Sequence, residues 1–248
     1  MWQEIKTAYR QSARVAPARP LLFALPVIAE FTQHVIEYRI GMFESVERLR
    51  EVAGHPERMG FGQVKALSLV VIAYWVIRQL ANMDGARLRV LGDRRSLILF
   101  AGVVLWTALT AIVQQFGGTL LAPLALNPVT LTIVGLAFFL LVTVLDVYLA
   151  AWKVGAALGN PGLNIPASFR IMTGNFWWSL GYFVAMLLPL MIVHYALNGL
   201  AVGRPEALLW PILAIDSLAV GYLGLVLSAT VYVTARRAAQ RKGVALIA

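Results

Sequence analysis

Long runs of apolar residues, separated by short polar segments, dominate the chain. A run of about 20 apolar residues can cross the hydrocarbon core of a bilayer as a helix. The pattern predicts six such spans, at residues 20–40, 63–82, 96–115, 129–152, 175–198 and 208–235. The runs are continuous rather than alternating, which favours helices over the strands of a barrel. We therefore expect an all-α polytopic membrane protein with six transmembrane helices.

The N-terminal segment, residues 1–19, has the pattern of an amphipathic helix on a membrane surface. Apolar residues recur on one side at helical spacing, and basic residues recur on another. The apolar side consists of Trp2, Ile5, Tyr9 and Ala13, and the basic side of Lys6, Arg10 and Arg14. We expect a single domain over residues 1–248: this segment, a first helix at 20–53, five further spans within 63–235, and a basic cytoplasmic tail at 236–248.

Composition supports the membrane class. Hydrophobic residues make up 60% of the chain and charged residues 13%, and the mean hydropathy is +0.75, whereas an average soluble domain is about 45–50% apolar and about 25% charged. The net charge of +9 and the pI near 10.3 raise the question of nucleic acid. Because the basic residues flank the apolar runs, they indicate membrane orientation instead, and we predict no nucleic-acid partner.

The distribution of Lys and Arg predicts the orientation. Basic residues concentrate at the N-terminus, between the second and third runs, between the fourth and fifth runs, and at the C-terminus. Positive residues mark the cytoplasmic side, so we expect both termini inside, in the cytoplasmic (inner) membrane of a bacterial-type cell. One segment departs from the rule. Residues 41–65 are expected on the outer side of the membrane, yet they contain the basic residues Arg48, Arg50, Arg58 and Lys65.

One stretch inside the first run is polar: AEFTQHVIEYR, residues 29–39. At 100° per residue, Glu30, Gln33, His34 and Glu37 fall within an arc of about 100°. We name these four side chains the polar seam. Ionisable residues at membrane depth usually face a bundle interior or a water-filled cavity. The polar seam is therefore expected to face other helices or water rather than lipid.

The helix that carries the polar seam is expected to run from Pro20 to Ala53, beyond the membrane, and to end at Gly54-His55-Pro56. Two polar residues of the fifth and sixth spans lie at a depth similar to the seam. The candidate binding residues are therefore Glu30, Gln33, His34, Glu37, His194 and Asp216. They either hold the bundle together or line a pocket for a cation, a proton path or a lipid headgroup. Asp146 lies near the cytoplasmic end of the fourth span, where a pairing with Lys153 or another cytoplasmic cation is expected.

Residues suited to catalysis or metal binding are sparse. The chain has no cysteine, which excludes disulfides, thiol nucleophiles and thiolate metal sites. Glu30, His34 and Glu37 supply carboxylate and imidazole groups on one helix face. However, the sequence has no H-E-x-x-H motif, no paired E-x-x-H motif, no phosphate-binding loop and no G-x-S-x-G elbow. We predict no catalytic residue, no metal and no cofactor.

Residues 168–183, SFRIMTGNFWWSLGYF, combine a short amphipathic segment, a Gly174-Asn175 turn and aromatic residues at the start of the next span. Such a turn ends a helix, and aromatics anchor a span at the membrane interface. This stretch resembles the pattern before a membrane span in six-helix bacterial inner-membrane proteins of the glycerophosphodiester phosphodiesterase membrane-domain type. The resemblance implies a six-helix architecture. It implies no active site, because the catalytic domain of that family is a separate soluble barrel.

These features favour a non-enzymatic membrane protein, an accessory or scaffold component in envelope or lipid physiology. The alternative is a small transporter or channel that uses the polar seam. The expected partners are the lipid bilayer and a protein that docks on residues 41–58 outside the membrane. The sequence is compatible with an oligomer.

Overall fold

The computed structural model of the protein describes residues 1–89 and 92–247, so Ala248 of the predicted tail lies outside the described residues. Within these ranges the chain forms ten α-helices, one 3₁₀ helix and no strand, which confirms the all-α class. The elements are α1 (Trp2–Ala18), α2 (Pro20–Arg39), α3 (Val46–Val52), α4 (Pro56–Met83), α5 (Arg94–Leu121), η1 (Ala122–Leu124), α6 (Pro128–Tyr148), α7 (Ala150–Leu158), α8 (Ile165–Met172), α9 (Phe176–Ala201) and α10 (Glu206–Arg241).

Five of these helices are long and apolar enough to cross a membrane: α4, α5 with η1, α6, α9 and α10. The helices α1 and α2 pass this test only as a pair, bent by 94°. The bend lies at Arg19 (φ −141°, ψ 65°), directly before Pro20, because a proline disfavours the helical conformation in the residue that precedes it. By length and composition the chain is a multipass membrane protein, with five spans or, if the bent pair is one broken span, six.

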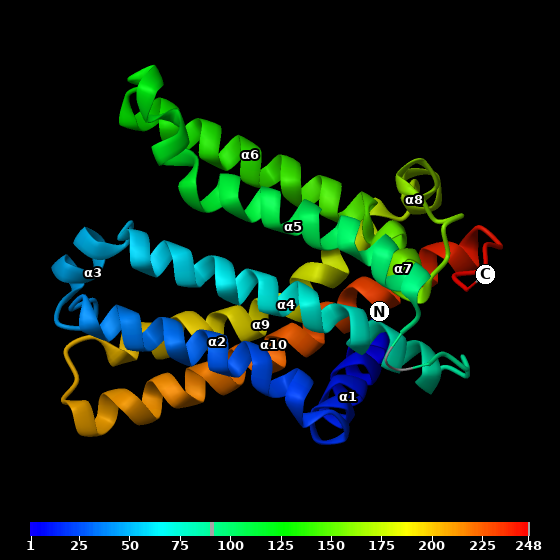
Figure 1. Ribbon diagram of the computed structural model, residues 1–248, viewed down its shortest axis with the longest axis horizontal. Coiled ribbons are helices and arrows are strands. Elements are labelled where there is room, and N and C mark those ends of the chain that lie inside the picture. The colour runs from blue at the N-terminus through cyan, green and yellow to red at the C-terminus, as the bar shows by residue number, and fades with distance from the viewer. Residues whose placement is uncertain (90–91, 248) are drawn as a thin grey trace.

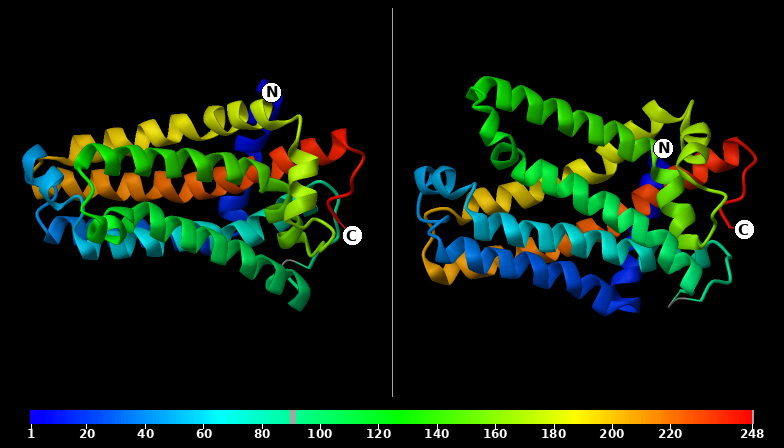
Figure 2. Two further views of the ribbon diagram at one scale, coloured as in Figure 1. Left: turned by 90° about the horizontal axis from the view of Figure 1, so that it is seen from above. Right: turned by 45° about the horizontal axis from the view of Figure 1, so that its top comes forward.

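The helices form a bundle with one diverging hairpin (Figures 1 and 2). The helices α2, α4, α9 and α10 lie side by side, and α10 contacts each of the other three. The hairpin of α5 and α6 is attached near α7 and separates from the bundle toward its far end (Figure 1). The helices α1, α7 and α8 and the C-terminus lie toward one end of the bundle, and α3 lies at the other. The two termini therefore share one end.

The predicted continuous helix over residues 20–53 is wrong. The helix α2 ends at Arg39, and Gly41 follows with a φ of +77°, a left-handed conformation that glycine adopts without steric cost. The Met42 N–H donates to Glu37 O at 2.9 Å, and the Gly41 N–H donates to Tyr38 O at 3.0 Å. These two hydrogen bonds form a Schellman motif, which ends the helix. The polar seam consequently ends in the last turns of α2 and does not continue on a helix over residues 41–53.

The predicted fourth span, residues 129–152, is interrupted as well. The helix α6 ends at Tyr148 and α7 begins at Ala150. The buried hydroxyl of Ser168 donates to Tyr148 O at 2.7 Å and accepts from the Trp152 N–H at 2.9 Å. It therefore stands between the two backbone groups that would pair in a continuous helix, which is one way to kink a helix.

The helix α1 packs on the bundle with a face that differs from the predicted one. Its buried residues are Ile5, Ala8, Ser12 and Val15. Trp2 and Ala13, which the sequence placed on the apolar side, are exposed. The Tyr9 hydroxyl donates to Met186 O of α9 at 2.6 Å, so α1 is tied to the bundle by a side-chain hydrogen bond as well as by apolar contact.

The predicted tail over residues 236–248 is helical in its first part, because α10 continues to Arg241. Within this extension, Arg237 Nη1 lies 3.0 Å from Glu4 Oε1 of α1. The guanidinium group of Arg237 also lies 4.2 Å from the ring centroid of Trp178 in α9. This basic residue therefore links α10 to α1 and α9 instead of belonging to a free tail.

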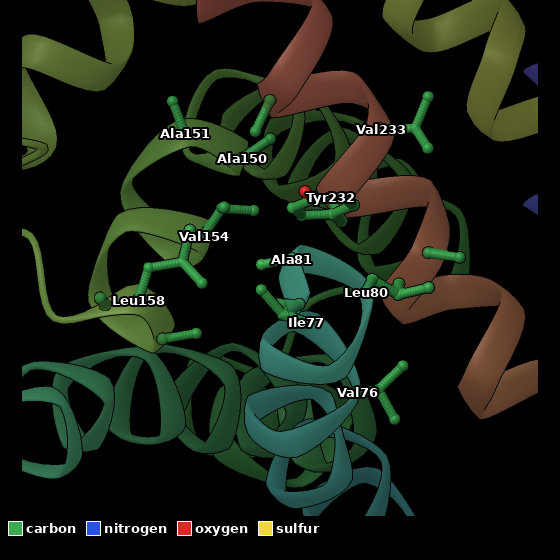
Figure 3. Packing of buried hydrophobic residues seen from close by; sticks show 14 of the residues in the cluster. Val76, Ile77, Leu80, Ala81, Ala150, Ala151, Val154, Leu158, Tyr232 and Val233 are labelled. Atoms are coloured by element: carbon green, nitrogen blue, oxygen red, sulfur yellow. The ribbon is translucent and has the colours of Figure 1, made fainter. Parts of the chain in front are cut away.

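The apolar core lies where α4, α7 and α10 meet (Figure 3). Figure 3 shows Ile77 and Ala81 of α4, Val154 of α7 and Tyr232 of α10 directed into the same space, and all four are buried. This core holds α7, and with it the near end of the α5–α6 hairpin, against the bundle. The far end of the hairpin has no such core and diverges.

Gly221 of α10 allows the close approach of α2. A Cβ at this position would lie 2.4 Å from Val27 Cγ2 and 3.2 Å from the backbone oxygen of Phe23. We predict that Gly221→Ala lowers the free energy of unfolding by about 1–3 kcal/mol, because an overpacked contact forces neighbouring atoms to shift. Thermal unfolding of the purified protein in detergent micelles measures this loss.

Gly181→Ala in α9 is the matched control, because a Cβ at Gly181 meets no atom within 4 Å. Alanine is the better helix former, so this variant should be at least as stable as the wild type. Equal stability of the two alanine variants would contradict the close approach of α2 and α10.

Candidate functional site

The polar seam of α2 faces the interior of the bundle, as predicted. Glu30, Gln33, His34 and Glu37 are between 1% and 5% exposed, whereas Phe31 is 38% exposed. The seam residues recur at i, i+3, i+4 and i+7, which places them on one face of the helix. The Gln33 Nε2–H donates to Glu37 Oε1 at 2.8 Å, so neighbouring seam residues also bind one another.

His34 connects α2 to α10. Its Nδ1 lies 2.9 Å from Glu37 Oε2, and its Nε2 lies 2.9 Å from Asp216 Oδ2. Glu30 Oε1 lies 3.5 Å from the same Nε2. The imidazole ring is therefore held between carboxylates on both sides, and His34 meets Asp216 as expected from their similar depth.

Asp216 is fully buried and joins α9 to the site. Its Oδ1 lies 2.8 Å from His194 Nδ1, and its Oδ2 accepts from Asn198 Nδ2 at 2.8 Å. His194 was predicted, but Asn198 was missed. Asn198 lies one helical turn after His194, on the same face, and this spacing was the available signal.

Two cations of α4 complete the network, and the sequence analysis missed both as site residues. Arg58 Nε donates to Glu37 Oε1 at 2.9 Å. Lys65 Nζ lies 2.8 Å from Glu30 Oε2 and forms an ion pair with it, although the geometry does not meet that of a hydrogen bond. We name the nine side chains together the charge network: Glu30, Gln33, His34, Glu37, Arg58, Lys65, His194, Asn198 and Asp216.

These ion pairs account for part of the excess positive charge in residues 41–65. Arg58 and Lys65 belong to α4, which begins at Pro56, and they pair with buried carboxylates instead of lying in a loop. The sequence signal for Arg58 and Lys65 was the excess of basic residues in a segment that is expected outside the membrane. Arg48, by contrast, pairs with the exposed Glu51.

The charge network lies in the half of the bundle toward α3, since Glu37 is in the last turn of α2 and Arg58 in the first turn of α4. Its other buried acids lie farther inside their helices. Glu30 is ten residues from the start of α2 and Asp216 is ten residues from the start of α10, or about 15 Å at 1.5 Å per residue. The hydrocarbon core is about 30 Å thick. Charged side chains at that depth are costly and usually occur in pairs, which explains why each carboxylate has a cationic or hydrogen-bonding partner.

The geometry of His34 requires an additional proton. An ionised carboxylate only accepts hydrogen bonds, and a neutral imidazole donates from only one nitrogen. Both nitrogens of His34 face carboxylate oxygens, so either the ring is an imidazolium or one carboxyl group is protonated. The carboxylates of Glu30, Glu37 and Asp216 carry three negative charges. Arg58 and Lys65 carry two positive charges, so one negative charge remains. This additional proton brings the charge network to neutrality.

Three ligand atoms, one each from Glu30, His194 and Asp216, lie within 4.8 Å of one another and could hold a metal ion. Carboxylate and imidazole ligands suit several transition metals. However, Asp216 and His194 are hydrogen-bonded to each other, and the ammonium group of Lys65 lies against Glu30. A metal ion would have to displace these contacts, and the absence of a metal stays a prediction.

Asp146 lies outside the charge network, as predicted. Its Oδ1 lies 2.8 Å from Lys153 Nζ and accepts from Trp106 Nε1 at 2.9 Å. The predicted pairing with Lys153 is confirmed. This ion pair lies in the last turn of α6 and in α7, toward the end of the bundle that holds both termini.

No protein-family model, curated protein or solved structure matches the chain. The fold and the site therefore define only a class, a helical multipass membrane protein with a buried charge network. The network joins four helices, α2, α4, α9 and α10, none of which supplies a complete set of charges alone.

Proposed function

We propose that the protein is a small transporter that moves protons across its membrane through the charge network. The observation that carries the proposal is His34, whose two ring nitrogens lie 2.9 Å from the carboxylates of Glu37 and Asp216. In this position the ring accepts a proton from one carboxyl group at one nitrogen and releases a proton to the other carboxylate from the second nitrogen. A proton thus passes between α2 and α10 while the ring stays in place.

His194, a partly exposed member of the charge network, gives this proton access to the surroundings. Its side chain is 15% exposed and lies 2.8 Å from Asp216, whereas His34 and Asp216 are at most 1% exposed. Buried groups that are reached through partly exposed ones form the pattern of a proton relay rather than of an isolated structural pair.

The proposal includes six spans with both termini inside a bacterial-type cytoplasmic membrane. The shared end of the termini supports it (Figure 1), as does the concentration of Arg and Lys before α2, before α5 and at the C-terminal end of α10. The resemblance of residues 168–183 to six-helix bacterial inner-membrane proteins points the same way.

Asp216→Asn tests the proposal because it removes the need for the additional proton at His34 and keeps a side chain of the same size. The amide donates to Nε2 of His34, so a neutral ring needs no additional proton between Glu37 and position 216. Asn198 Nδ2 loses Oδ2 as an acceptor in this variant and keeps its hydrogen bond to His194 O at 3.0 Å. The charges of Glu30 and Glu37 still balance those of Lys65 and Arg58. In proteoliposomes with a pH-sensitive dye inside, we expect wild-type vesicles to acidify under an inward proton gradient and the variant to match empty vesicles.

Glu206→Gln is the matched control, because Glu206 is an exposed acid at the start of the same helix, outside the charge network. Its flux should equal that of the wild type. Wild-type vesicles that acidify no faster than empty ones, or an Asp216→Asn variant with unchanged flux, would refute the proposal.

A second candidate is an accessory or scaffold component in envelope or lipid physiology. It is supported by α6, a helix that is largely exposed over residues 128–141 and that projects with α5 from the bundle (Figure 1). The α3 turn within residues 41–58 is a second surface for a protein partner. Gentle extraction followed by native mass spectrometry separates the candidates, because a scaffold retains a second protein in fixed stoichiometry.

A further inference from the structure

A separate cavity lies between the α5–α6 hairpin and the helices α4, α9 and α10. Its volume is about 270 Å³. Most of its lining is apolar, with Leu69 and Ala73 of α4 facing Phe100 and Val103 of α5. Along α5 the lining continues to Gln114, a length of about 21 Å at 1.5 Å per residue. The cavity shares no residue with the charge network.

The position of the cavity indicates what fills it. The helices α4, α5, α6, α9 and α10, which contribute all of its lining except Lys153, are the five long apolar helices, so the cavity lies within the hydrocarbon region of the membrane. One leaflet of that region is about 15 Å thick, half of the core. A slot of about 21 Å therefore has the length and the apolar lining to take an acyl chain that enters from the membrane interface.

One end of the cavity carries a pair of opposite charges. Asp146 and Lys153 belong to its lining, and their ion pair has a separation of 2.8 Å. Both the Lys153 ammonium and the Trp106 N–H bind the same carboxylate oxygen, Oδ1. The Asp146 side chain is 41% exposed. Its Oδ2 is therefore available at the surface, and Lys153, which has three N–H groups, retains donors for an anion.

We propose that this cavity binds one phospholipid with a zwitterionic, primary-amine headgroup. One acyl chain occupies the slot, the ammonium group of the lipid donates to Asp146 Oδ2, and the phosphate lies beside Lys153 Nζ. A carboxylate and an ammonium side by side complement a headgroup that carries one charge of each sign. A quaternary choline headgroup has no N–H to donate, so the site discriminates between the two zwitterionic lipids.

Native mass spectrometry of the full chain tests the proposal with equimolar phosphatidylethanolamine and phosphatidylcholine of identical acyl chains in mixed micelles. We expect the wild type to retain one phosphatidylethanolamine at least about tenfold more often than phosphatidylcholine, the factor expected for a single charge-assisted hydrogen bond. Asp146→Asn should lower this ratio to about one. A wild type without preference, or a preference unchanged in Asp146→Asn, would overturn the proposal.

Ala73→Phe tests the slot without touching the charge pair, and it decides the matter if Asp146→Asn fails to fold. The phenylalanine side chain projects from the cavity wall, so the variant should lose the retained lipid of either type. Ala137→Phe is the matched control, since Ala137 is exposed on α6 and lies outside the cavity lining; it should bind as the wild type does. Undiminished lipid in the Ala73→Phe variant would overturn the proposal.

Discussion

Replacing Lys65 with methionine should strongly destabilise the protein, and adding Glu30→Gln should recover much of the loss. The Lys65 ammonium lies 2.8 Å from Glu30 Oε2, and Glu30 is 1% exposed. The single substitution leaves a buried carboxylate without its cation, which costs about 3–5 kcal/mol. The double variant removes both charges and leaves neutral groups of similar size, whose burial is far less costly.

A double-mutant cycle on the free energy of unfolding measures the coupling directly. The four proteins are the wild type, the two single variants and the double variant, each unfolded thermally in the same detergent. Arg50→Met is the control, because Arg50 is an exposed cation of α3 outside the charge network, and such surface substitutions change stability by about 0.5 kcal/mol or less. Additive losses in the two single variants would show that the pair of Lys65 and Glu30 is not coupled.

The orientation of the polar seam was predictable because it depends only on local spacing. Four polar residues on one face of an otherwise apolar helix must face protein or water, and the structure places all four inside. The meeting of Asp216 and His194 with the polar seam was predictable for a similar reason. Helical rise is constant, so residues at equal distances from the same membrane surface lie at the same level.

The cations of the charge network were harder to predict because they were assigned to a loop. The second apolar run begins at Gln63, whereas the helix begins at Pro56, so Arg58 appeared to be a loop residue. Lys65 lies at the edge of that run and belongs to the segment 41–65 that is expected outside the membrane. Where a helix begins in a polar segment, the sequence has no apolar pattern that would reveal its start. Only the partners of these side chains, which lie on another helix, show that they belong inside.

The breaks in two predicted helices depend on interactions that spacing does not record. Gly41 ends α2 because it adopts a positive φ and closes two reverse hydrogen bonds, yet glycine is also tolerated within helices at a modest cost. The break after Tyr148 depends on the hydroxyl of Ser168, twenty residues later. A hydrophobic run indicates where a helix is apolar, and it says little about whether the helix is continuous.

Replacing Arg78 with methionine should also cost about 3–5 kcal/mol of folding free energy, at the opposite end of α4 from the charge network. Arg78 is 1% exposed. Its Nη1 donates to Ala157 O at 2.8 Å, and its Nη2 donates to Arg89 O at 2.7 Å. Both carbonyls, near the end of α7 and in the loop after α4, lose their donor in the variant, and a hydrogen bond to a charged group contributes about 1.5–3 kcal/mol.

The fork of the guanidinium group matters as much as its charge, so Arg78→Lys should recover only part of the loss. A lysine ammonium is a point charge and cannot reach two carbonyls on different segments with the geometry of the arginine fork. The carboxylate of Asp93 lies 3.7 Å from Arg78 Nη2. Its pKa lies below the ordinary value because the Ser96 backbone N–H donates to it. This negative charge stabilises an arginine or a lysine at position 78. Thermal unfolding should therefore rank the wild type above Arg78→Lys and Arg78→Lys above Arg78→Met, with the exposed control Arg95→Met close to the wild type. If lysine restored full stability, charge alone would hold α4, α7 and the loop between α4 and α5 together, and the carbonyl contacts would be incidental.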